Sequence, residues 1–161
     1  MTTSRKLLIF GGLLLAVWGM GYGIWYAVFI EHQTLDGLGS ALATGFMRAA
    51  ENRMAESQAA LADVAARSFV YVRQVDAHGH WIGLGLLLLI LGIAFDRVGF
   101  AERVRMYIAM ALLAGAIAFP FGVLLETWNR GTVPQAIAVI GSALVILGLS
   151  GTAWGFARSD S

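Results

Sequence analysis

Three histidines and one glutamate are the side chains of this 161-residue chain best suited to binding a cofactor. They are His32, His78, His80 and Glu126, and each stands at the end of an apolar run. Neutral imidazole is a common ligand for zinc, copper and iron, and a carboxylate can complete such a set. Because ionisable groups at membrane depth are rare and costly, this clustering predicts a shared metal site at one membrane face.

The spacing of His78 and His80 limits how they can act. Residues two apart on an α-helix point about 200° away from each other. Both can bind one ion only if the helix start is unwound; otherwise they face different partners. A structural interpretation also stays open for all the candidates. An interfacial histidine can be an amphipathic anchor, and Glu126 can simply pair with Arg130.

The stretch Asp76-Ala-His-Gly-His-Trp81, followed by a leucine-rich run, resembles the haem-ligating helix of the large subunit of haem-copper oxidases. It is also similar to small uncharacterised bacterial four-span proteins whose second span opens with an acidic residue, H-x-H and glycine. The resemblance implies haem or metal ligation, without oxygen chemistry. A b-type haem held by two histidines needs them on facing helices, for which His32 and His80 would serve. Tyr22 and Trp81 are the aromatic residues expected to line its pocket.

Composition places these residues in a membrane protein. The chain is 58% hydrophobic and 13% charged, with a mean hydropathy of +0.74, whereas soluble domains average roughly 45–50% and about 25%. These values exclude a disordered chain, an ordinary cytosolic enzyme and a nucleic-acid partner; the net charge of +1 agrees. The absence of cysteine excludes thiolate-bound metals, iron–sulfur clusters and covalent c-type haem.

Four apolar runs cover about 7–30, 79–95, 106–125 and 133–157. A helix needs roughly 17–25 such residues to cross the bilayer. The sequence therefore predicts an all-α integral membrane protein, a four-helix transmembrane bundle forming a single domain over 1–161. The glycine pairs Gly79/Gly83 and Gly151/Gly155 are typical of close helix packing in lipid. Basic residues predict cytoplasmic N- and C-termini in a bacterial-type inner membrane; they are Arg5, Lys6, Arg97, Arg103, Arg105 and Arg158.

The segment 31–77 is too polar to span the membrane, but its apolar residues recur at helical spacing. It could form one amphipathic helix on the membrane surface or a protruding helical hairpin on the outer side. We expect the hairpin, with its turn near Glu51-Asn52-Arg53 and Asn52 capping the returning helix. A turn midway between His32 and the H-x-H pair would place all three histidines at nearly the same height.

No H-E-x-x-H, G-x-S-x-G or phosphate-loop motif occurs, so an enzymatic role is not favoured. The leading functional hypothesis is binding of a metal ion (Cu, Zn or Fe) or haem b, for electron transfer or metal handling. The alternative is a non-catalytic accessory or assembly subunit of a larger membrane or redox complex, or a homo-oligomer, that docks through the hairpin.

Overall fold

The computed structural model describes residues 1–159, and this part of the chain is all-helical, without strands. Four of its helical stretches are long and apolar enough to cross a membrane, as predicted. The elements in chain order are α1 (Thr3–Tyr26), a π-helix (Ala27–Glu31), α2 (His32–Ala50), α3 (Met54–Ala94), a 3-10 helix (Phe95–Arg97), α4 (Glu102–Leu125) and α5 (Thr132–Ser159).

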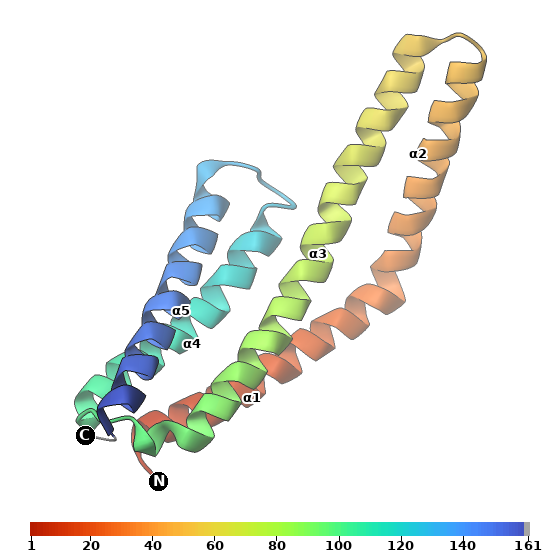
Figure 1. The fold of residues 1–161 in the computed structure, drawn as a ribbon. Coiled ribbons are helices and arrows are strands. Elements are labelled where there is room, and N and C mark those ends of the chain that lie inside the picture. The colour runs from red at the N-terminus through yellow and green to blue at the C-terminus, as the bar shows by residue number, and fades with distance from the viewer. Residues whose placement is uncertain (160–161) are drawn as a thin grey trace.

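The helices form two antiparallel hairpins of unequal length (Figure 1). In the long hairpin, α1 and α2 run up one side and α3 returns along the other. In the short hairpin, α4 packs against α1 and the adjoining half of α3, and α5 packs against α4 (Figure 1). The long hairpin therefore projects well past the short one, and both chain ends lie at the opposite end of the molecule.

The hairpin predicted for segment 31–77 is confirmed in its helical form. We call the two stretches that project, α2 and residues 54–77 of α3, the hairpin arms. Asn52 adopts a left-handed conformation with φ 59°, which asparagine tolerates better than most residues. The predicted capping role of Asn52 is wrong: Arg53 holds the cap position and makes no side-chain cap. Asn52 instead supplies the backbone reversal.

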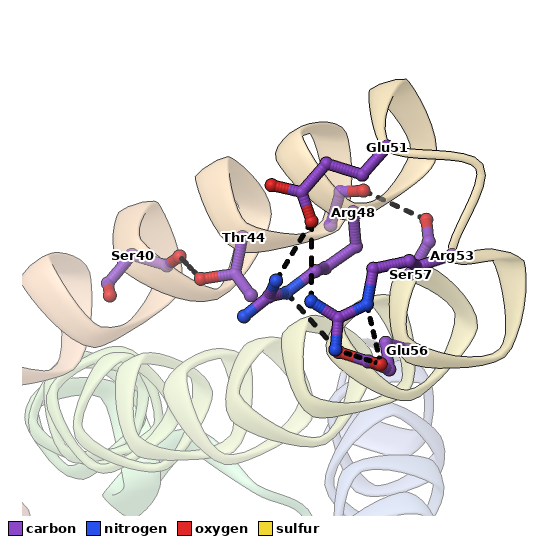
Figure 2. Close-up of polar contacts among 8 residues, drawn as sticks. Ser40, Thr44, Arg48, Glu51, Arg53, Glu56 and Ser57 are labelled. Carbon is purple, nitrogen blue, oxygen red and sulfur yellow. Dashed lines mark hydrogen bonds and ion pairs between the residues drawn. The ribbon is translucent and has the colours of Figure 1, made fainter.

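Ion pairs close the tip of the hairpin (Figure 2). Arg48 contacts Glu51 at 2.9 Å and Glu56 at 3.3 Å, while Arg53 contacts Glu56 at 2.5 Å. The hydroxyl of Ser57 donates to the carbonyl oxygen of Gly45 at 2.9 Å, which ties the two arms together just below the turn. Charges at the tip are thus paired with one another.

Glycine lets the helix backbones touch within each hairpin. A Cβ added to Gly12 on α1 would lie 2.6 Å from the carbonyl oxygen of Gly85 on α3. One added to Gly141 on α5 would lie 2.4 Å from the backbone nitrogen of Phe119 on α4. A side chain larger than the hydrogen of glycine would push the two helices apart at these contacts.

The packing role predicted for Gly79 and Gly83 is wrong, because an added Cβ at either position would meet no atom within 4 Å. Gly151 and Gly155 do face the protein: Gly155 packs against Val98 and Phe100. Spacing of four residues defines a face of a helix, but it does not say whether that face turns toward a neighbour.

Two carboxylates hold the start of α1 against the turn between α3 and α4. Glu102 accepts the backbone N–H of Ser4 at 2.8 Å and the Ser4 hydroxyl at 3.0 Å. Asp96 accepts the hydroxyl of Thr2 and a guanidinium N–H of Arg5. Negative charge at a helix N-terminus is stabilising, so these contacts fasten the two hairpins at the end where the chain begins and ends.

Candidate functional site

His78 and His80 lie on one continuous stretch of α3 and face different helices. His78 packs against α1, where a Cβ added to Gly23 would be 2.9 Å from Cδ2 of the imidazole. The His80 ring contacts Phe119 of α4 edge-on, with centroids 4.8 Å apart. The helix is continuous through both histidines and is not unwound there. The two imidazoles therefore cannot bind one ion together, and each faces a different partner.

Both imidazoles are oriented by their own helix. Nδ1 of His78 lies 3.2 Å from the carbonyl oxygen of Gln74, and Nδ1 of His80 lies 2.6 Å from that of Asp76. A carbonyl oxygen only accepts, so Nδ1 carries the proton in each ring. In a neutral ring the lone pair is then on Nε2, which is the arrangement found when a histidine binds a metal and its other nitrogen is held by the backbone.

His32 lies elsewhere. Its side chain is 85% exposed, and Nε2 is 3.3 Å from Asp36 one turn along α2. The neighbouring Glu31 accepts the Tyr71 hydroxyl at 3.1 Å, which puts residue 31 level with residue 71. His78 is a further seven residues along α3, about 10 Å at 1.5 Å per residue. The prediction that the three histidines share one height is therefore wrong, because the turn falls at residues 51–53 and not at the midpoint.

Glu126 forms an ion pair with Arg73 rather than with Arg130. Its Oε2 lies 2.9 Å from Nε of Arg73, and its side chain is only 13% exposed. The guanidinium groups of Arg73 and Arg130 both lie over the ring of Phe69, at 5.0 and 4.2 Å from its centroid. These contacts join α3 to the end of the short hairpin. No motif in the sequence marks Arg73 for this role.

Tyr22 and Trp81, predicted to line a haem pocket, pack against each other between α1 and α3. Their ring centroids are 5.6 Å apart, and the centroid of Trp18 lies 6.2 Å from that of Trp81. The Tyr22 hydroxyl donates to the side-chain oxygen of Gln74, and Trp81 is buried. Gln74 was missed because no motif marks it; it lies four residues before His78 on the same helix face.

The four predicted ligands do not converge in the structure. Across the described residues, no group of three or more His, Asp or Glu side chains is placed to hold a metal ion. His78 and His80 remain as two oriented imidazoles on one helix, while His32 and Glu126 have Asp36 and Arg73 as partners. The metal or haem site stays a prediction.

The hairpin arms carry a second candidate site, made of apolar side chains. On α2, Leu35, Leu42 and Phe46 are exposed at intervals of about two and about one turn, and so form a stripe. On α3, Met54, Leu61 and Val72 repeat at about two and about three turns and form another.

The charged groups of the arms are largely engaged with one another. Besides the four residues of the tip, Arg67 pairs with Asp63 at 2.8 Å, and Arg73 pairs with Glu126. The arms thus expose apolar stripes, while their charged groups are paired with one another. Such a surface is suited to binding through apolar contacts more than through charge.

No family model, curated protein or solved structure matches the chain. The class is therefore defined by the fold alone: an all-helical protein with four helices able to cross a membrane among residues 1–159, which suggests a multi-pass membrane protein.

Proposed function

We propose that this protein is a non-catalytic accessory or assembly subunit of a membrane complex, and that it docks its partner through the hairpin arms. In this proposal the short hairpin and the half of the long hairpin beside it are embedded in the bilayer, where their exposed apolar side chains meet lipid. The segment 31–77, which contains the arms and the turn between them, carries six acidic residues and four arginines. A segment with that many charges stands outside the hydrocarbon.

The exposed stripes on the arms support this proposal. Outside the bilayer, Phe46 at 67% exposure and Leu42 at 41% would face water, where burying apolar surface is favourable by about 25 cal/mol per Å². Rows of exposed apolar residues on a soluble surface mark interaction sites. Since the arms' arginines are already paired, the binding energy comes from burial of these stripes.

Serine at both Leu42 and Phe46 should release the protein from its complex. A central aromatic contact is worth about 2 kcal/mol or more, which corresponds to an affinity on the order of 30-fold weaker. After mild-detergent extraction of native membranes, a native gel should show the wild-type chain in a large assembly and the variant at its own mass. Ala43→Ser, exposed on a neighbouring face of α2, is the matched control and should leave the assembly intact.

An assembly that survives both Leu42→Ser/Phe46→Ser and the α3 counterpart Leu61→Ser would contradict docking through the arms. If the large species contains only this chain, the partner is a second copy and the protein is a homo-oligomer. If the wild-type chain migrates alone, the accessory role is refuted.

We also propose an inner-membrane location with both termini in the cytoplasm and the arms on the outer side. Six basic residues lie on segments at the end of the molecule that holds both termini (Figure 1): Arg5, Lys6, Arg97, Arg103, Arg105 and Arg158. Cytoplasmic loops carry such an excess of cations. A reporter fused after Ser161 should read as cytoplasmic, and one inserted at Glu56 as external. The opposite result would turn the arms toward the cytoplasm.

A second candidate function is binding of a metal ion (Cu, Zn or Fe) or haem b by the H-x-H pair. It is favoured by one observation, the backbone-held Nδ1 atoms that leave Nε2 of His78 and His80 free to ligate. His32 and Glu126 would need to leave their present partners to join them. A visible spectrum and metal analysis of the purified protein test it: a Soret band indicates haem, stoichiometric metal without that band indicates an ion, and the absence of both rejects it.

A further inference from the structure

An apolar groove runs between α1 and α4 on the side of the molecule where the two hairpins meet. Its volume is ≈ 470 Å³, and its walls include Leu14 and Trp18 of α1 with Ile117 and Phe121 of α4. Trp81 of α3, also among its lining residues, is buried. All of its lining residues are apolar or glycine.

The groove continues toward the chain termini. A second hollow of ≈ 440 Å³ shares Gly11, Leu14 and Leu113 with the first and extends to Thr3 and Lys6. Gly11 forms the floor where the two join, because a Cβ added there would lie 2.8 Å from Cδ1 of Leu113. From Lys6 to Trp18 the whole groove, with both hollows, follows α1 for about 18 Å at 1.5 Å per residue.

Lys6 is the cation at the open end of this groove. Among residues 1–159 its ammonium makes no ion pair, whereas the neighbouring Arg5 pairs with Asp96 and Arg105 pairs with Glu102. A free positive charge at one end and an apolar wall along the rest match the two parts of a lipid: a charged headgroup and a hydrocarbon chain.

We propose that the groove binds one acyl chain of an anionic phospholipid, with the lipid phosphate at Lys6 and the chain end beside Trp18 and Phe121. The site rests on the membrane insertion proposed above and does not depend on docking through the arms. An ammonium group binds phosphate as a compact point charge, and basic residues at the cytoplasmic face attract anionic lipids. The occupant is therefore an anionic lipid of the inner leaflet.

The test uses the full chain in detergent, with phosphatidylglycerol or phosphatidylcholine of the same acyl chains added, and native mass spectrometry to count bound lipid. The wild type should retain one phosphatidylglycerol and prefer it over phosphatidylcholine. Lys6→Gln should reduce that preference about fivefold, the effect of one surface cation. The matched control Arg103→Gln also removes an exposed cation at the same end, but from outside both hollows, and should bind as the wild type does.

Filling the groove should abolish binding of both lipids. Gly11→Leu places a side chain on its floor, where the new Cβ would meet the flexible end of Leu113 and no backbone atom. Ile117→Trp fills the groove from α4 if the first variant fails to fold. Retention unchanged in Lys6→Gln and in the filled variants would overturn the proposal, as would a dimer that buries Ile117. Alkaline extraction of membranes tests insertion separately, because an inserted wild-type protein stays in the membrane fraction. The arm variant Leu42→Ser/Phe46→Ser should bind lipid as the wild type does, which separates this proposal from docking through the arms.

Discussion

Leucine in place of Gly12 should lower the free energy of unfolding of the purified protein by about 3 kcal/mol, at the upper end of the usual range for overpacking. A Cβ at this position would lie 2.6 Å from the carbonyl oxygen of Gly85 and 2.8 Å from the backbone nitrogen of Leu89. Backbone atoms of α3 cannot rotate away as a side chain would, so the whole helix has to shift. Denaturant titration in detergent micelles measures the loss, and Gly12→Ala should fall between wild type and leucine.

The matched control is Gly83→Leu, since an added Cβ there would meet no atom within 4 Å. It carries the same change on a helix of the same hairpin and should alter the free energy of unfolding by less than about 0.5 kcal/mol. Equal effects of the two substitutions would mean that α1 and α3 are not packed through Gly12 and Gly85.

If the wild-type protein purifies with haem or metal, His80→Ala should remove all of it. The substitution deletes Nε2, the atom left free when Nδ1 is held by the carbonyl of Asp76 at 2.6 Å. His78→Ala should weaken binding less if the two rings serve different partners. The measurements are the Soret absorbance and the metal content per chain.

Two controls separate ligation from packing. Phe119→Leu removes the edge-on ring contact of His80 but keeps the imidazole, and should retain the cofactor. His80→Gln keeps a hydrogen-bonding group without the ring and should lose the cofactor while the protein still folds. Cofactor content unchanged in His80→Ala would contradict the ligand hypothesis and leave His80 as a structural side chain.

Features that depend on a few neighbouring residues could be predicted from the sequence. Four uncharged runs of sufficient length specify helices able to cross a membrane, and all four are present in the structure. The polar string Glu51-Asn52-Arg53 specified the turn of the hairpin, and asparagine at φ 59° completes it. The opposite directions of His78 and His80 follow from helix geometry alone. Each of these is set by composition or periodicity within one or two turns.

Contacts between helices were decided only by the tertiary structure. The sequence could not say that Glu126 pairs with Arg73 and not with Arg130, or that Gly12 and Gly85 form a seam while Gly79 and Gly83 face outward. Such pairings depend on how far each helix is rotated about its axis and shifted along it. In an apolar span all faces of the helix have nearly the same composition, so composition does not determine how the helix is rotated about its axis. That rotation is fixed by which glycines let two backbones pack closely and by which buried polar side chains find partners. His32 was misplaced for a different reason, because equal heights for the three histidines required a turn at their midpoint. With the turn at 51–53, residue 31 lies level with residue 71 and not with His78.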